Sequence, residues 1–212
     1  MADGKAVASD YAPQYGKFQH PDITADGAER ARVALARLDT LWVNTGTLCN
    51  VECAHCYIES SPVNDRLSYL NAAELTPFLG EAAAMGAREI GFTGGEPFMN
   101  PEMGEMTEMA LERGFSVLIL TNAMRPMMRP KAQEHLLALQ ARFGNALKLR
   151  VSLDHFEAAR HDEERGAGSF ASGLAGLRWL QANGFSISVA GRTLWGESEA
   201  EMRDGFAAPG VD

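Results

Sequence analysis

Short apolar runs alternate with longer amphipathic segments over most of this 212-residue chain. Each run has the composition of a strand, and apolar residues recur at helical spacing in the segment that follows it. Strands are expected at 41–45, 88–95, 115–122, 146–154 and 185–194, and helices at 72–86, 101–114, 131–144, 169–184 and 199–207. Repeated strand–helix–strand units wind right-handedly around a parallel sheet. The pattern therefore predicts an α/β fold, either a closed or partly closed β/α barrel or an open doubly wound sheet.

Residues 1–38 precede this alternation and differ from it in composition. Residues 1–25 carry Gly, Pro, Asp and Tyr without periodicity, and 28–38 has the spacing of a short amphipathic helix. We therefore expect an N-terminal extension with a short helix at 1–38 and a core domain at 39–212.

Charge and hydropathy limit the function classes. The chain has 19 basic and 28 acidic residues and a formal charge of -9, without a dense run of Lys or Arg, so a nonspecific nucleic-acid surface is disfavoured. The N-terminus lacks the apolar core of a signal peptide, and no stretch approaches the roughly 18 apolar residues of a membrane span. These features predict a cytoplasmic protein without a nucleic-acid or membrane partner.

The cysteines all lie in the segment TLCNVECAHCYIES, as Cys49, Cys53 and Cys56. An odd number of cysteines on one short loop does not fit a disulfide framework, because one thiol would be left over. The loop follows the first expected strand, and ligands of α/β folds bind at the carboxyl ends of the strands. Metal or redox chemistry is therefore the better interpretation.

Two kinds of metal site use cysteine ligands. Structural zinc normally takes four protein ligands in tetrahedral geometry, and His55 is the one other ligand close by in the sequence. Three cysteines instead suit a [4Fe-4S] cluster that leaves one iron open to another ligand. On these residues alone, an iron-sulfur electron-transfer or sensor protein and a zinc-binding interaction module remain alternatives to an enzyme.

The motifs resemble those of one family. The segment CNVECAHC resembles the cluster-binding signature of the radical S-adenosylmethionine (SAM) enzymes, and Gly94-Gly95-Glu96-Pro97 resembles their GGEP segment at the end of the second strand. TNA at 121–123 and VSLDHFEAARHDEERGAGSF at 151–170 are similar to segments that end the third and fourth strands in the same family. The similarity covers about residues 40–193.

The resemblance implies a fold and a set of cofactors. The family has a partial TIM-like barrel of six β/α units, of which five are visible here and the sixth is missing. A further chain segment or a partner is therefore expected to complete the barrel. The implied cofactors are one [4Fe-4S] cluster and S-adenosyl-L-methionine.

The resemblance also implies roles for individual residues. Cys49, Cys53 and Cys56 would bind the cluster, and the open iron would be chelated by the amino and carboxylate groups of SAM. Ser152 and Asp154 could contact the ribose hydroxyls or the surroundings of the methionyl carboxylate, and Arg165 could pair with that carboxylate. The other residues implied to lie at the cofactor site are His55, Tyr57, Gly94, Gly95, Glu96, Pro97 and Asn122.

The implied reaction is the reductive cleavage of SAM. The reduced cluster would pass one electron to SAM, and the resulting 5'-deoxyadenosyl radical would abstract hydrogen from a substrate. The sequence leaves open whether this substrate is a peptide or a small metabolite. A reductant such as flavodoxin or ferredoxin is the other expected partner.

Overall fold

A computed structural model describes residues 16–207, so parts of the expected extension (1–15) and core (208–212) lie outside it. The chain divides into two units, Met1–Ala36 and Arg37–Asp212. The prediction of a helix at 28–38 is wrong, because the backbone there is non-helical, with Val33 95% and Leu35 67% exposed. A helix of this length is marginal in water unless its apolar face is packed, and these two side chains are not.

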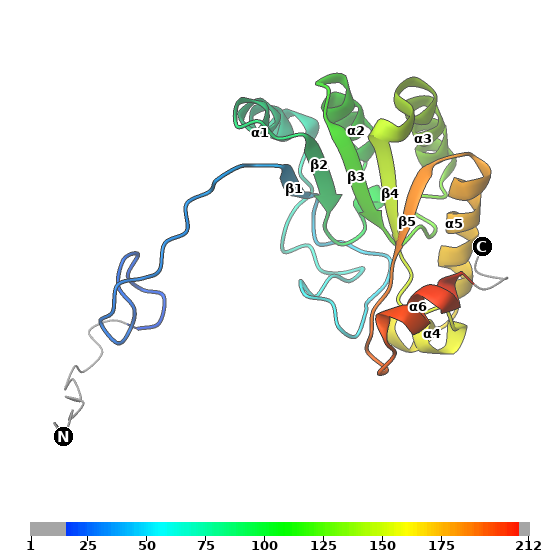
Figure 1. The fold of residues 1–212 in the computed structure, drawn as a ribbon. Coiled ribbons are helices and arrows are strands. Elements are labelled where there is room, and N and C mark those ends of the chain that lie inside the picture. The colour runs from blue at the N-terminus through cyan, green and yellow to red at the C-terminus, as the bar shows by residue number, and fades with distance from the viewer. Residues whose placement is uncertain (1–15, 208–212) are drawn as a thin grey trace. The chain divides into compact units, whose positions relative to one another are not determined.

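The second unit is built on a five-stranded parallel sheet whose spatial order follows the chain order, β1-β2-β3-β4-β5. Figure 1 shows the five strands side by side. The strands are β1 (Thr40–Asn44), β2 (Glu89–Thr93), β3 (Ser116–Thr121), β4 (Leu147–Ser152) and β5 (Ser186–Ala190).

The helices between the strands lie on one side of the sheet, as Figure 1 shows for α1, α2, α3 and α5. Because each strand pairs with the next along the chain, every right-handed crossover passes over the same face. This is the winding of a β/α barrel, whereas a doubly wound sheet reverses its strand order. The bounds are α1 (Ala72–Ala84), η1 (Pro97–Met99), α2 (Met103–Glu112), α3 (Pro130–Phe143), η2 (Gly144–Ala146), α4 (Ala158–Arg165), α5 (Ser169–Ala182) and α6 (Glu199–Phe206).

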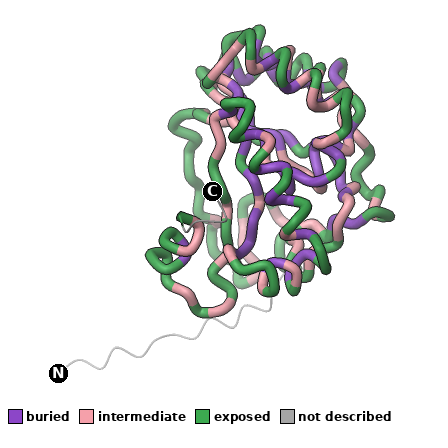
Figure 2. The backbone as a smooth tube through the Cα atoms, turned by 90° about the vertical axis from the view of Figure 1, so that its right-hand side faces the viewer, coloured by how far each residue is buried: buried purple, intermediate pink, exposed green. Residues whose placement is uncertain are grey.

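The hydrophobic core lies between the sheet and these helices. Alternate strand residues point to the same face, so Ile90 and Phe92 of β2 lie with Val117 and Ile119 of β3, all fully buried. Leucines and methionines of the helices pack against them, and Figure 2 shows the buried positions concentrated on the strands and the helix sides that face them. The sequence prediction of a partial β/α barrel with five visible units is confirmed.

The structure adds one helix that the sequence pattern did not predict. Helix α4 lies between β4 and α5, where the sequence analysis expected a connection. Its residues, AARHDEER, show no apolar stripe. The helix instead buries three polar side chains, His161, Glu164 and Arg165, so hydrophobic periodicity could not reveal it.

The carboxyl ends of the strands meet at one edge of the sheet. The long connection from β1 to α1 leaves from this edge, and α4 and α6 lie at the same end (Figure 1). Within residues 16–207, none of the helices combines the length and the apolar composition that a bilayer crossing requires. The polar loops and helix ends gathered at this edge form the candidate site.

Candidate functional site

The three cysteine thiols lie around one cavity of about 160 Å³ at the carboxyl edge of the sheet. All three are free; Cys49 is buried, and Cys53 and Cys56 are half-buried. The remaining residues that line the cavity are Val51, Tyr57, Ser60, Thr93, Gly94, Gly95, Leu120, Thr121, Asn122, Ser152, Arg165 and Arg192. The structure therefore brings the cysteine loop together with the ends of β2, β3, β4 and β5.

The cysteine loop is fixed by backbone contacts at both of its ends. The amide of Cys49 donates to the carbonyl of Ser61 at 3.1 Å, and the amide of Glu96 donates to the carbonyl of Leu48 at 3.0 Å. The amide of Ser60 donates to the sulfur of Cys56 at 3.2 Å. These hydrogen bonds fix the backbone positions of the cysteines, and none of them uses a thiol as the donor.

The donor set fits a polynuclear cluster better than a single ion. Within residues 16–207 no three His, Cys, Asp or Glu side chains converge on one point as ligands of a single metal ion do. In a [4Fe-4S] cluster each thiolate binds a different iron, so the thiols surround a space instead of meeting at a point. His55 is not among the lining residues, and its Nδ1 lies 2.7 Å from Glu164 Oε2, which disfavours a fourth, zinc-completing ligand.

Burial sets the protonation of the thiols. It raises the pKa of Cys49 to about 11, and it also raises the pKa of Cys53, although the nearby Arg165 guanidinium acts in the opposite direction. A thiolate is the form that binds metal, so metal binding at these two residues would release protons.

Gly94 and Gly95 are required by the packing of the protein itself. A Cβ at Gly95 would lie 2.2 Å from the carbonyl oxygen of Leu48, and a Cβ at Gly94 would lie 2.6 Å from that of Gly46. Gly94 also has a φ of 145°, which side chains rarely allow. The glycines thus let the backbone after β1 cross the end of β2, and both border the cavity.

Glu96 ties the end of β2 to the end of β3. Its carboxylate is buried and accepts hydrogen bonds from the Thr121 hydroxyl at 2.8 Å, the Asn122 amide at 2.8 Å and the Phe98 amide at 3.2 Å. Burial raises the pKa of Glu96 to about 7, against the lowering effect of these donors. Neither Glu96 nor Pro97, which begins η1, lines the cavity.

Asn122 connects β3 to the cysteine loop. Its side-chain amide donates to Asn50 Oδ1 at 2.9 Å and lies 3.9 Å from the sulfur of Cys49. Its side-chain oxygen accepts from the amide of Met124 at 3.0 Å, which fixes the orientation of the side chain. Asn122, which the family resemblance assigns to the site, therefore lies at the cavity beside Cys49.

The opposite side of the cavity carries two guanidinium groups. Arg165 forms a bidentate pair with Asp154, from Nε at 2.6 Å and Nη2 at 3.0 Å. Arg192 lies 3.2 Å from the same carboxylate through Nε. Ser152 lines the cavity, whereas Asp154 is buried behind the arginines and does not. Ser152 is therefore placed to meet a ligand directly, whereas Asp154 could act on one only through the arginines, and the predicted contacts of both residues with SAM remain predictions.

Glu164 and Arg192 are two charged residues that the sequence analysis did not assign to the site; it also missed Val51, Ser60, Thr93 and Leu120 of the cavity lining. The amide of His55 donates to Glu164 Oε1 at 2.9 Å, and Arg192 Nη1 donates to the same oxygen at 2.8 Å. The backbone carbonyl of Glu164 also accepts from the amide of Ala54 at 2.9 Å. For Glu164 one signal was available, because connections as long as 155–168 usually have structure or function of their own.

His55 and Tyr57 flank Cys56 on its solvent side. The side chain of His55 is 68% exposed, and Tyr57 is 77% exposed although it borders the cavity. His55 therefore anchors the loop to α4, and Tyr57 stands at the mouth of the cavity.

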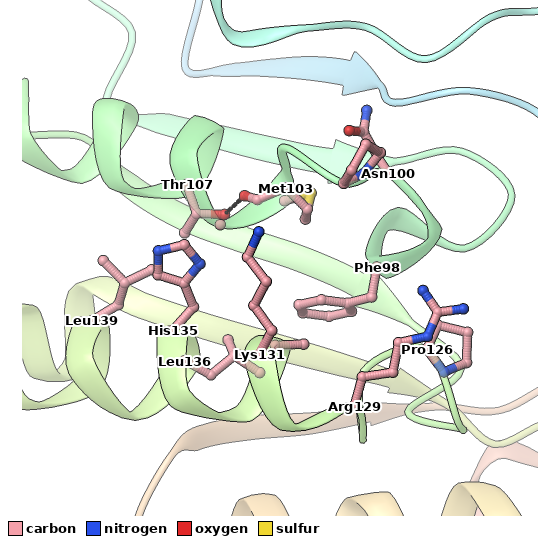
Figure 3. A pocket seen from close by; sticks show the side chains of 13 residues that line it. Phe98, Asn100, Met103, Thr107, Pro126, Arg129, Lys131, His135, Leu136 and Leu139 are labelled. Carbon is pink, nitrogen blue, oxygen red and sulfur yellow. Dashed lines mark hydrogen bonds between the residues drawn. The ribbon is translucent and has the colours of Figure 1, made fainter.

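A second cavity, of about 100 Å³, lies between α2 and α3 and contains none of the cysteines. Figure 3 shows Phe98, Met103 and Leu136 around it, with Lys131 and His135 reaching across. The ring of His135 packs against Gly104, where a Cβ would lie 2.2 Å from its Nδ1. The three cysteines therefore lie at the first cavity and not at this one.

The Radical SAM superfamily model matches residues 43–204 of the chain. Among curated proteins, the chain is 30% identical over 143 residues to the antilisterial bacteriocin subtilosin biosynthesis protein AlbA of Bacillus subtilis, covering 67% of this chain and 30% of that protein. It is 31% identical over 147 residues to the AdoMet-dependent heme synthase of Methanosarcina barkeri (66% and 38%). It is 30% identical over 138 residues to the mycofactocin maturase MftC of Mycobacterium ulcerans (65% and 35%).

Solved structures agree on the fold. The crystal structure of Streptococcus suis SuiB bound to S-adenosylmethionine matches with a TM-score of 0.66 at 15% identity, over 81% of this chain and 37% of that one. SuiB bound to its precursor peptide SuiA matches equally well, with a TM-score of 0.66 at 16% identity, over 82% and 36%. The chain thus spans 30 to 38% of the length of the three curated relatives.

Proposed function

Because this chain belongs to the radical SAM superfamily, we propose that Cys49, Cys53 and Cys56 bind a [4Fe-4S] cluster with one iron open to S-adenosylmethionine. The observation that carries the proposal is the arrangement of three free thiols around one cavity at the carboxyl ends of the strands. When bound, the cluster supplies the electron for reductive cleavage of SAM, whose adenosyl fragment then abstracts hydrogen from the substrate. The residues of the chain would bind the cluster and SAM, orient them toward each other, and shield the reacting groups from water.

The arginine side of the cavity is proposed to bind the SAM carboxylate. Arg165 and Arg192 together carry two positive charges, which are offset by the buried carboxylates of Asp154 and Glu164. Each guanidinium has five N–H donors, and those that these ion pairs leave unused could donate charge-assisted hydrogen bonds to a carboxylate in the cavity. Ser152, which borders the same space, can donate to or accept from a ribose hydroxyl.

The glycine side is proposed to receive the SAM amino group. Gly94 and Gly95 border the cavity with no side chain, so a ligand can approach their backbone closely, although the amide of Gly95 already donates to the carbonyl of Gly46 at 2.8 Å. Glu96 lies behind them with three hydrogen bonds out of the about four that a carboxylate can accept. It contributes its charge to this side and, through Asn122, holds the end of β3 in place. Pro97 stiffens the exit from the strand.

The two residues beside Cys56 are proposed to protect the cluster. His55 holds the loop against α4 through Glu164, and Tyr57 partly covers the mouth of the cavity. Water and oxidisable side chains must be kept away from a radical, because they would otherwise react with it.

We propose a peptide as the substrate. AlbA is a subtilosin biosynthesis protein, and the SuiB structure holds a precursor peptide, both similar to this chain. The heme synthase among the relatives supports a small metabolite as the second candidate. The reaction also needs a one-electron donor, such as flavodoxin or ferredoxin, and a reducing compartment such as the cytoplasm.

Residues 39–212 are proposed to form the catalytic core, with 1–38 as an extension. Strand β5 has an unpaired edge in the described sheet, and Val189 on it is 38% exposed. Parallel sheets normally have both faces covered and their edges protected. A further strand, from the same protein or from a partner, is therefore proposed to pair with β5.

The cluster assignment is tested by reconstituting the protein with iron and sulfide without oxygen. The parent should bind about four iron atoms, the number that defines this cluster type, and with dithionite should convert SAM to 5'-deoxyadenosine. Changing any one of Cys49, Cys53 or Cys56 to Ala should lower the iron content and abolish the product. Three variants with the iron content and visible spectrum of the parent would refute the assignment.

A further inference from the structure

The hydroxyl of Ser60 is a buried polar group without a partner. Ser60 is 3% exposed, and its Oγ makes no hydrogen bond to any residue within 16–207. The residue lines the cavity that contains the three thiols, and its own amide donates to the sulfur of Cys56 at 3.2 Å. The Ser60 hydroxyl is therefore held next to the thiols and has an unused donor.

Neighbouring polar groups around the cavity have partners. The Thr121 hydroxyl donates to Glu96, and the Asn122 side chain donates to Asn50. Ser61, the next residue in the chain, accepts hydrogen bonds at its Oγ from the amides of Val63 and Asn64. A buried hydroxyl normally has a partner, because removing it from water without one costs free energy. The exception at Ser60 is explained if its acceptor is part of what the cavity binds.

We propose that the Ser60 hydroxyl donates a hydrogen bond to a sulfur atom of the bound cluster and thereby raises its reduction potential. The inference rests on the cluster assignment given above. A hydrogen bond to sulfur stabilises negative charge, and the reduced cluster carries one more negative charge than the oxidised cluster. Ser60 is thus a positioning and tuning residue, since it acts on the cluster through its sulfur atoms and not on the substrate.

The test is the midpoint potential of the reconstituted full chain, measured by electron paramagnetic resonance during a redox titration without SAM. Ser60→Ala should bind the same amount of iron and should be harder to reduce. We expect the reduction equilibrium constant to fall three- to tenfold, and a tenfold fall corresponds to 59 mV for one electron. Ser61→Ala is the matched control, because it removes a buried hydroxyl of the same loop that already has partners, and its potential should equal that of the parent.

The other outcomes separate the possible errors. If Ser60→Ala keeps its full iron content and its potential is unchanged, the inference is overturned. If that variant also binds SAM more weakly, the hydroxyl contacts SAM and not the cluster. If Ser60→Ala binds no iron, Ser60→Thr decides: iron and potential equal to the parent support the hydroxyl contact, and loss of iron there overturns it. Failure of the cluster assignment itself would be visible in the parent, which would then bind no iron.

Discussion

The two sides of the cysteine cavity are held together by different forces. On the side of β2 and β3, which we call the glycine wall (Gly94, Gly95 and Asn122), the backbone after β1 packs directly against two glycines. On the side of β4, β5 and α4, the arginine wall (Ser152, Arg165 and Arg192), two guanidinium groups share the buried carboxylate of Asp154. One wall depends on shape and the other on charge.

This difference separates two tasks that a cofactor site must perform. A wall fixed by close backbone packing tolerates no added atom, so it defines where a ligand can lie. A wall fixed by ion pairs holds charges that a ligand can also use, so it provides affinity for an anion. The substitutions and the pH change below test this division, beginning with the largest expected effect.

Asp154→Ala should have the largest effect, because it leaves Arg165 buried without its bidentate partner. Breaking a buried pair by removing one partner typically costs about 3–5 kcal/mol of unfolding free energy. Urea unfolding followed by circular dichroism measures this loss. Arg142→Ala is the control, since it removes exposed ion pairs with Glu108 and Glu112 and should cost much less than the loss of the buried pair. Equal losses in the two variants would show that the arginine wall does not depend on buried charge.

Glu96 supports the glycine wall by accepting hydrogen bonds from Thr121 and Asn122, and its raised pKa predicts that stability depends on pH. Burial raises its pKa from the ordinary 4.5 to about 7, so the folded protein keeps a proton that the unfolded chain has released. The stabilisation from this proton is complete below pH 4.5 and is lost as the pH rises through 7. This stabilisation is on the order of 3 kcal/mol, because the pKa of Glu96 rises from 4.5 to about 7 on folding.

The measurement is the difference in unfolding free energy between the parent and Glu96→Gln, without iron or SAM, at several pH values from 4.5 to 8. The advantage of the parent should shrink with rising pH and then become constant above about 7, the pKa of the buried group. A difference that stays constant across this range would mean that Glu96 titrates normally, and the glycine wall would then contain no pH-sensitive element.

Gly95→Ala should have a smaller effect that is independent of pH and salt. Its Cβ would lie 2.2 Å from the carbonyl oxygen of Leu48, so the backbone must shift, and such overpacking typically costs about 1–3 kcal/mol. Gly80→Ala in α1 is the matched control, because its Cβ would meet no atom within 4 Å. That change should stabilise the protein by about 0.4–1 kcal/mol through reduced freedom of the unfolded chain. A neutral Gly95→Ala would contradict the role of shape in this wall.

The sequence located the strand ends that carry the glycine wall, but it did not reveal helix α4 or Arg192 of the arginine wall, for a physical reason. Hydrophobic periodicity located β2 and β3, and the resemblance to the radical SAM motifs then assigned Gly94, Gly95 and Asn122 at the ends of these strands to the cofactor site. The same patterns gave all five strands and the helices α1, α2, α3, α5 and α6 to within a few residues at most ends.

The arginine wall depends on tertiary contacts that leave no periodic signal. Helix α4 buries His161, Glu164 and Arg165 through ion pairs and hydrogen bonds with distant residues, and a polar octapeptide of this kind resembles a solvated loop. The pairing of Arg192 with Asp154 likewise joins the loops after two different strands, which only the fold brings together. The incorrectly predicted helix at 28–38 shows the reverse: the periodic pattern is present, but its apolar side chains Val33 and Leu35 are exposed and no helix forms.

The strand order of the sheet also fixes when the site can form during synthesis. Each strand pairs with its neighbour in the chain, so the sheet can grow one unit at a time as the protein leaves the ribosome, where domains fold from the N-terminal side. The cysteine loop follows the first strand and emerges early, but Arg192, which bonds to Glu164 and Asp154, follows the last. The thiols therefore emerge before the arginine wall that borders them can form. A complete cavity becomes available to a cluster only after β5 has joined the sheet.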